Sequence, residues 1–108
     1  MLGRLFGMKA LNRSTDEQTR IDQACRSLAL YQTNSCPYCV TVRRTIKKLQ
    51  LKIELRDIQR NPAWRQELMQ GGGMTQVPCL RIEAANGRVQ WMYESADIKR
   101  YLRQHFSS

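Results

Sequence analysis

Apolar residues recur along the chain with two different periods, which together predict a mixture of helices and strands. Between Ser14 and about Leu28 they fall three or four positions apart, as on one face of a helix. Shorter stretches are continuously apolar or alternate with polar residues, as in strands. The predicted elements, in order, are a helix at 14–28, a strand at 28–32, a helix at 37–49, a strand at 52–57, a helix from 61 to the glycines at 71–73, strands at 79–83 and 89–93, and a helix from 95.

The same periodicity predicts which side chains are buried. In the strand at 52–57, Ile53 and Leu55 are expected to face the same way. On the second helix, the basic residues Arg43, Arg44, Lys47 and Lys48 are expected opposite the apolar stripe. The expected inward residues of three amphipathic helices are Ile21, Ala24, Cys25 and Leu28, then Cys39, Val42, Ile46 and Leu49, and last Ile98, Tyr101, Leu102 and Phe106.

Short polar motifs mark the ends of these elements. Ser14 opens a sequence with capping-box spacing, and Asn61 followed by Pro62 is a typical helix start. Asn86-Gly87 predicts a hairpin between the last two strands. A strand, a helix and a strand in succession favour a right-handed crossover with a parallel strand pair.

Length and composition indicate one domain. The chain has 108 residues, of which 42% are hydrophobic, and no apolar run reaches the length of about 20 residues that a membrane span needs. The first residues lack the pattern of a secretory signal, so a cytoplasmic location is expected, where cysteines are more often catalytic or metal-binding than disulfide-bonded. Residues 1–27 are interpreted as an arm and a helix before a main domain at 28–108. Residues 1–13 are expected to be a loose tail, in preference to a membrane-surface anchor.

The charge is strongly basic and unevenly placed. Lys and Arg number 18 against 9 Asp and Glu, which gives a net charge of +9. Residues 1–13 carry +3 of it and residues 29–56 carry +5. Such a field favours anionic partners, which include glutathione, acidic proteins, anionic lipids and nucleic acid. Because aromatic residues do not interleave with the basic ones, nucleic acid is not expected as a partner.

Cys36-Pro37-Tyr38-Cys39 carries the clearest chemical signal. The pair of thiols stands where a predicted strand gives way to a helix, at a spacing that allows a small disulfide ring to close and reopen. Cys36 is expected at the helix N-terminus, where free N–H groups and the helix dipole stabilise a thiolate. Cys39 falls on the inward stripe and is expected to be buried. This asymmetry favours thiol–disulfide exchange, with one attacking and one resolving thiol.

The same cysteines could instead bind zinc or hold an iron–sulfur cluster between two chains. The other candidate ligands, Cys25, Cys79 and His105, are isolated rather than paired at ligand spacing. Cys25 and His105 are interpreted as packed residues. Cys79 is also expected in the core, although Pro78 could place it near the active thiols. No metal is therefore expected.

Three motifs in order resemble the dithiol glutaredoxin family. They are Cys36-Pro37-Tyr38-Cys39 after a strand, Thr75-Gln76-Val77-Pro78 before a later strand, and Ser95-Ala96-Asp97 opening the last helix. The resemblance runs from about Leu28 to Phe106. It implies an α/β, thioredoxin-like fold with a four-stranded mixed sheet flanked by helices, here with an extra N-terminal helix. Residues 81–83 and 91–95 also resemble the N-terminal domain of glutathione transferases.

The resemblance implies a role for each matching residue. Cys36 corresponds to the nucleophile that forms a mixed disulfide with glutathione, and Cys39 to the resolving thiol. The peptide bond before Pro78 is implied to be cis, which would turn the Val77 backbone toward the thiol to pair with glutathione. The residues implied to bind glutathione are Pro37, Tyr38, Arg65, Gln76, Val77, Pro78, Glu94, Ser95 and Asp97.

Two of these assignments have plainer alternatives. Ser95 and Asp97 open the last helix, whose free N–H groups would hold the γ-glutamyl carboxylate, but Ser95 could also be a simple helix cap. Arg65 would hold the glycyl carboxylate, or it could lie on a solvated helix face. The chain also departs from the family, with Thr33 where a Lys is common and Ala96 where an acidic residue is common.

The expected function is a glutathione-dependent thiol–disulfide oxidoreductase in cell redox homeostasis. Its co-substrate would be glutathione, its partners disulfide-containing proteins, and its state monomeric. The alternatives are an iron–sulfur or zinc carrier that uses the same cysteines, and a glutathione transferase-like binding domain.

Overall fold

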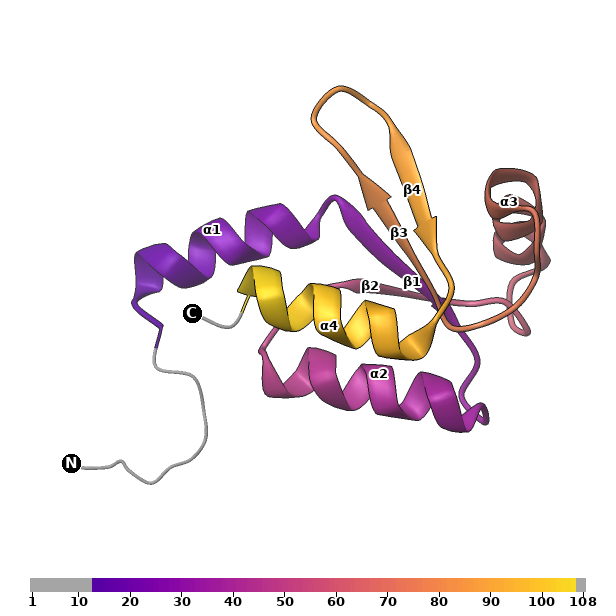
Figure 1. Cartoon of the computed structure of the whole chain (residues 1–108), viewed down its shortest axis with the longest axis horizontal. Coiled ribbons are helices and arrows are strands. Elements are labelled where there is room, and N and C mark those ends of the chain that lie inside the picture. Colours follow the sequence, from indigo (N-terminus) through magenta and orange to yellow (C-terminus); the bar gives the residue numbers. More distant parts are fainter. Residues whose placement is uncertain (1–12, 107–108) are drawn as a thin grey trace.

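One four-stranded sheet, in the order β2–β1–β3–β4, organises the computed structural model, which describes residues 13–106 (Figure 1). The strands are β1 (Leu28–Gln32), β2 (Glu54–Asp57), β3 (Cys79–Glu83) and β4 (Val89–Met92). β1 is parallel to β2, and β3 is antiparallel to both β1 and β4, so the sheet is mixed as predicted. At its centre, Leu30 pairs with Leu55 on one side and with Leu80 on the other.

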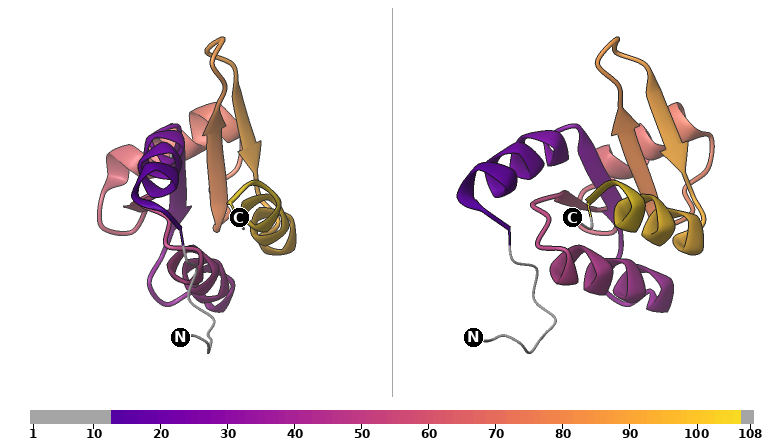
Figure 2. Two further views of the ribbon diagram at one scale, coloured as in Figure 1. Left: turned by 90° about the vertical axis from the view of Figure 1, so that its left-hand side faces the viewer. Right: turned by 60° about the vertical axis from the view of Figure 1, so that its left-hand side comes forward.

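Helices cover both faces of the sheet (Figure 2). The four helices are α1 (Thr15–Cys25), α2 (Pro37–Lys48), α3 (Pro62–Gly72) and α4 (Ser95–Phe106). α2 and α4 pack together on one face, with Val42, Ile46, Ile98 and Leu102 buried against Leu30 and Leu80. On the opposite face, Leu68 of α3 is buried with Tyr31, Ile58 and Cys79. Alternating side chains of β1 thus supply both cores.

α2 and α4 run in the same direction, so their N-termini lie at one end of the molecule and their C-termini at the other (Figure 1). Arg13, just before α1, joins the two C-terminal ends. Its guanidinium donates to the Leu49 carbonyl at 2.6 Å and to the Phe106 carbonyl. A cation is favourable there because the last carbonyls of a helix lack intrahelical partners and carry the negative end of its dipole.

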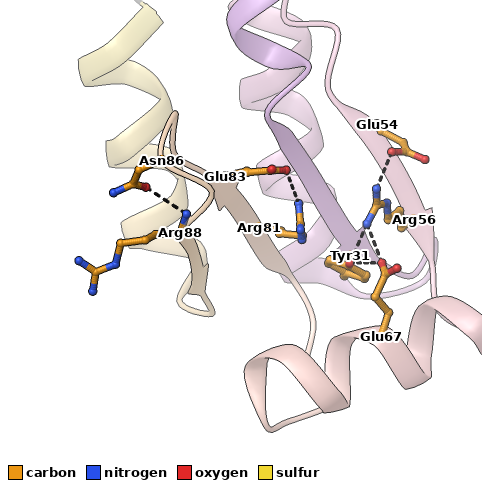
Figure 3. Close-up of polar contacts among 8 residues, drawn as sticks. All are labelled: Tyr31, Glu54, Arg56, Glu67, Arg81, Glu83, Asn86 and Arg88. Atoms are coloured by element: carbon orange, nitrogen blue, oxygen red, sulfur yellow. Dashed lines mark hydrogen bonds and ion pairs between the residues drawn. The ribbon is translucent and has the colours of Figure 1, made fainter.

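A charged cluster ties β1 and β2 to α3 (Figure 3). Arg56 lies between two carboxylates, at 2.9 Å from Glu54 and 2.6 Å from Glu67. The Tyr31 hydroxyl accepts a hydrogen bond from Arg56 at 2.7 Å and donates one to Glu67. Burial raises the pKa of Tyr31 to about 12, and its hydrogen bond to Glu67 acts in the same direction.

Several boundaries and exposures differ from the sequence predictions. α1 ends at Cys25 rather than near 28, and Ala24 is exposed, although Ile21 and Cys25 on the same helix contact the core. Ile53 is buried, but Leu55, on the edge strand β2, is 42% exposed because no helix covers it. α4 begins at Ser95 itself: the Ile98 N–H donates to the Glu94 carbonyl, so Glu94 occupies the cap position.

The expectations for residues 1–12, which concern the loose arm and the membrane-surface anchor, lie outside the described residues. Within residues 13–106, no helix has the length and hydrophobicity that a membrane-spanning helix requires. The helix predicted before the main domain is present as α1. Its Ser14 and Glu17 form both hydrogen bonds of a capping box.

Candidate active site

Cys36 occupies the N-cap position of α2, at the end of the loop that connects β1 to this helix. Its backbone is extended and Pro37 is the first helical residue, which suits proline because that position needs no N–H donor. The Cys36 side chain is partly exposed, whereas the Cys39 side chain is fully buried one turn further on. The sequence therefore predicted both the location and the asymmetry of the two thiols correctly.

The surroundings of Cys36 favour its thiolate. Partial burial opposes ionisation, but the N–H of Cys39, the Cys39 thiol, the N–H of Tyr38 and the charge of Arg43 together hold the pKa of Cys36 below its ordinary value. The two backbone donors belong to the first turn of α2, whose N–H groups have no intrahelical acceptor. Cys36 thus has the electrostatic setting of a nucleophilic cysteine.

Cys39 has the opposite setting. Burial raises the pKa of the Cys39 thiol to about 11, and the neighbouring Cys36 adds to the rise through its hydrogen bond and its charge. At neutral pH the pair therefore holds one proton more firmly on Cys39 than on Cys36. Once Cys36 is in a disulfide, its charge no longer raises the pKa of Cys39, so Cys39 can lose its proton more easily and attack that disulfide.

Arg43 anchors the loop that presents Cys36. It was expected on the solvent side of α2, but it is half-buried. Its guanidinium donates to the Gln32 side chain, to the Thr33 carbonyl at 3.1 Å and to the Asn34 carbonyl at 3.3 Å. Arg43 thereby satisfies carbonyl groups of the β1–α2 loop and brings a positive charge close to the active thiol.

The segment before β3 faces Cys36. The Val77–Pro78 peptide bond is cis, and the Val77 carbonyl oxygen lies 4.0 Å from the Cys36 sulfur. Val77 is partly exposed and Gln76 is exposed. The backbone of this segment is therefore accessible to a molecule held at the thiol.

A groove of about 340 Å³ adjoins this segment. It collects residues from the start of α2, from the segment before β3 and from the start of α4, where the first N–H groups of α4 can hold an anion. Six of the residues predicted to bind glutathione line it: Tyr38, Gln76, Val77, Pro78, Glu94 and Ser95.

Arg65 lies on the other side of the segment before β3 from that groove. It lines a second depression, of about 510 Å³, together with Thr33, Pro62 and Thr75. Thr75 lines the second depression and Gln76 the first, so adjacent residues separate the two. The Arg65 side chain is exposed on the first turn of α3 and is available to a ligand that extends into this depression.

Asp97 does not line the groove beside α4. Its carboxylate instead pairs with Arg100 at 2.9 Å, one turn further along the same helix. Tyr93, in contrast, lines the groove although it was not among the predicted site residues. Its hydroxyl donates to the Met74 carbonyl at 3.0 Å, which joins β4 to the loop before Pro78. Its position directly before Glu94 and Ser95 is the signal that could have identified it.

The remaining cysteines and the histidine do not join the active thiols. Cys25 and Cys79 are fully buried, and burial raises the pKa of Cys79 to about 12 in spite of a hydrogen bond from Tyr93. His105 is exposed, but its ring packs against that of Tyr101, with ring centroids 4.1 Å apart, so it lies beside the apolar face of α4 and not in the core. In the described part of the chain, no three His, Cys, Asp or Glu residues are grouped to hold a metal ion.

Comparison with solved structures shows the same fold. A maleylacetoacetate isomerase from Anaeromyxobacter dehalogenans matches 76% of this chain at 24% identity and a TM-score of 0.58, although the match spans only 37% of the isomerase chain. A wheat glutaredoxin matches 84% of this chain and 87% of its own at 17% identity and a TM-score of 0.54. The thioredoxin-like protein BC3987 matches 68% and 96% at 22% identity and a TM-score of 0.54.

Comparison at the level of sequence identifies the family. No curated protein gives a significant match to the chain. The sequence model of the glutaredoxin family matches residues 28–85, which are more than half of the chain and contain Cys36, Cys39 and the cis-proline segment. The chain therefore belongs to the glutaredoxin family.

Proposed function

We propose that the protein is a glutathione-dependent thiol–disulfide oxidoreductase that acts through Cys36 and Cys39. The observation that carries this proposal is the contrast between the two sulfurs. Cys36 is accessible at the open end of α2 with a lowered pKa, and Cys39 is buried beside it with a pKa raised to about 11. This is the arrangement that a nucleophile and a resolving thiol require.

On a glutathionylated protein, the Cys36 thiolate would attack the glutathione sulfur. The bond between glutathione and the substrate breaks, a Cys36–glutathione disulfide forms, and the released substrate thiolate takes up a proton. A glutathione thiolate then attacks the mixed disulfide, releases oxidised glutathione and restores the Cys36 thiolate. On a protein disulfide, Cys39 instead displaces the substrate thiolate from Cys36, and two glutathione molecules reduce the resulting Cys36–Cys39 disulfide.

The two depressions beside Cys36 suit the two charged ends of glutathione. Its γ-glutamyl carboxylate would accept from the N–H groups at the start of α4, and its ammonium group would pair with Glu94, which lines the same groove. Its cysteinyl backbone would pair with Val77, and its glycyl carboxylate would reach Arg65. A solved isomerase of the same fold holds glutathione in its active site, which supports this ligand class.

The test is reduction of the mixed disulfide of glutathione and β-mercaptoethanol, coupled to glutathione reductase and NADPH. Cys36→Ser is expected to abolish turnover. Cys39→Ser should keep activity on this substrate, because only one thiol is needed, and should lose activity on protein disulfides. Ser35→Ala, an exposed neighbour of the nucleophile, serves as the matched control. Full activity of Cys36→Ser would show that the proposal is wrong.

A second candidate is glutathione binding without disulfide exchange, as in a transferase-type domain. The structural similarity to the isomerase favours it, although that protein is much longer than the matched region. The two candidates separate in one pair of measurements. Calorimetric binding of glutathione with no disulfide turnover would support the second, whereas turnover that depends on Cys36 would support the first.

A further inference from the structure

A basic groove runs between α2 and α4, away from the two depressions of the active site. It encloses about 540 Å³ and is lined by two threonines of α2 and by five basic residues, Arg44, Lys47 and Lys48 of α2 and Lys99 and Arg103 of α4. Among residues 13–106, no acidic residue lines it. Like charges in one concave surface repel one another, and a bound anion relieves this repulsion.

The ion pairs of the described residues do not reach four of the basic residues of this groove. Those between residues 13 and 106 involve Lys52, Arg56, Arg81 and Arg100, and none involves Arg44, Lys47, Lys48 or Lys99. The nearest acidic residue on α4, Asp97, is paired with Arg100. Within the described residues, no ion pair to these four side chains neutralises their positive charge.

The basic groove begins close to the active thiol. Thr41, at its near end, is five residues beyond Cys36, and its hydroxyl donates to the Tyr38 carbonyl at 2.8 Å. Tyr38 itself lines the groove proposed to hold glutathione. The starts of α2 and α4 lie at the same end of the molecule (Figure 1), so a protein that approaches Cys36 from this end can extend along both helices, whose side chains line the basic groove.

We propose that the basic groove docks an acidic segment of the disulfide-bearing partner protein. This inference rests on the proposed oxidoreductase function and adds the chemistry of its protein substrate. From Thr41 to Lys48 the helix rises about 10 Å. An extended segment of about three or four residues covers the same distance, and alternate side chains of such a segment would place about two Asp or Glu residues against the bases of both helices.

Two features favour a protein segment over the other polyanions. None of the described residues that line the basic groove is aromatic, so they offer no platform on which bases could stack. None of the large exposed hydrophobic residues, Tyr38, Leu55, Met69 and Met74, lines it either, so no side chain there would insert into a lipid surface. Its concave shape between two helices fits a narrow chain better than a flat membrane.

The experiment compares two synthetic peptides that differ only in charge. Each carries one glutathionylated cysteine followed by a four-residue segment, of Glu in one peptide and of Gln in the other. At low ionic strength, kcat/KM for the Glu peptide is expected to exceed that for the Gln peptide about tenfold, and the ratio should approach one in ~0.5 M NaCl, where charges are screened. Titration of ¹⁵N-labelled protein with the Glu peptide should shift the amide signals of α2 and α4.

Charge reversal locates the effect. Lys48→Glu with Lys99→Glu should remove the preference for the Glu peptide and leave turnover of the small glutathione–β-mercaptoethanol disulfide unchanged. Arg20→Glu with Arg88→Glu alters the net charge equally at exposed positions on α1 and on the β3–β4 hairpin, and should retain most of the preference. Figure 3 shows Arg88 pointing away from the sheet.

The outcomes separate the inference from the function on which it rests. Loss of turnover for the small disulfide and both peptides would contradict the proposed function, and the amide shifts would still report docking. Normal turnover with equal rates for the Glu and Gln peptides and no shifts in α2 or α4 would overturn the docking inference. Tight, salt-sensitive binding of a DNA duplex or of anionic vesicles in place of the Glu peptide would overturn it in favour of those partners.

Discussion

Gly72→Ala tests whether the end of α3 sets the shape of the proposed glutathione groove. A Cβ atom at Gly72 would lie 1.9 Å from the Tyr93 hydroxyl oxygen, whereas ordinary contact begins near 3.4 Å. The hydroxyl must therefore retreat by about 1.5 Å, the difference between these distances. At its new place it can no longer donate to the Met74 carbonyl, which it now meets at 3.0 Å.

The cost follows from these contacts. Loss of one neutral hydrogen bond destabilises by about 1 kcal/mol, and the misfit of the ring adds up to about 1 kcal/mol. Alanine recovers little helix propensity, because Gly72 is the last residue of α3. We therefore expect the free energy of unfolding in urea to fall by about 1 to 2 kcal/mol. Because Tyr93 lines the groove, the KM for glutathione should also rise, about fivefold if ~1 kcal/mol of binding is lost.

Two further variants make this prediction specific. A Cβ atom at Gly73 would have no other atom within 4 Å, but the backbone φ there is 92°. Gly73→Ala should therefore reduce stability through backbone strain and leave the KM for glutathione unchanged. Tyr93→Phe removes the closest atom of the clash, so the double variant Gly72→Ala with Tyr93→Phe should cost less than the two single variants together. Additive costs, or an unchanged KM in Gly72→Ala, would refute the argument that Gly72 positions Tyr93.

Three other outcomes follow from the structure. Alkylation of Cys36 by iodoacetamide should rise with pH and level off below the range of a free thiol, whose pKa is about 8.5, because its pKa is lowered; a profile like that of the unfolded chain would contradict this. Arg13→Ala should lower the free energy of unfolding by about 2 kcal/mol, since two helix-end carbonyls lose a charged donor, and exposed Arg20→Ala should have little effect. Because the pKa of Tyr31 is about 12 in the folded chain and about 10 when unfolded, its contribution is complete below pH 10 and is lost as the pH rises through 12. Tyr31→Phe should therefore flatten the alkaline loss of stability by about 2 to 3 kcal/mol, and an unchanged slope would exclude this role.

Much of the fold could be predicted because local signals and hydrophobic periodicity agree. The bounds of β1 and β3 were predicted to the residue, since β1 is largely an apolar run between polar residues, and β3 begins directly after Pro78. The exposure of Leu55 has a tertiary origin. The predicted alternation of Ile53 and Leu55 is that of a strand, but β2 lies at the edge of the sheet, and periodicity within one segment does not show which edge is left uncovered.

The site was predictable where a residue acts through its own position in a helix, and less so where it acts through contacts distant in sequence. The placement of Cys36 and Cys39 follows from helix geometry alone. The sequence placed Arg43 on the solvent side of α2. The loop carbonyls to which it donates come within reach of its side chain only when β1 and α2 pack together. The close approach of Gly72 to Tyr93 likewise joins α3 to the end of β4, which no local pattern reveals.

Because α2 and α4 run in the same direction, the molecule has two distinct ends. Cys36 lies at the end that holds the helix N-termini. Arg13 binds carbonyl groups at the opposite end, about 18 Å away along the 12 residues of α2. A dye, bead or fused reporter attached on the α1 side would thus leave the sulfur facing solution. Such an attachment would suit measurements of this dithiol on an electrode surface or on single molecules.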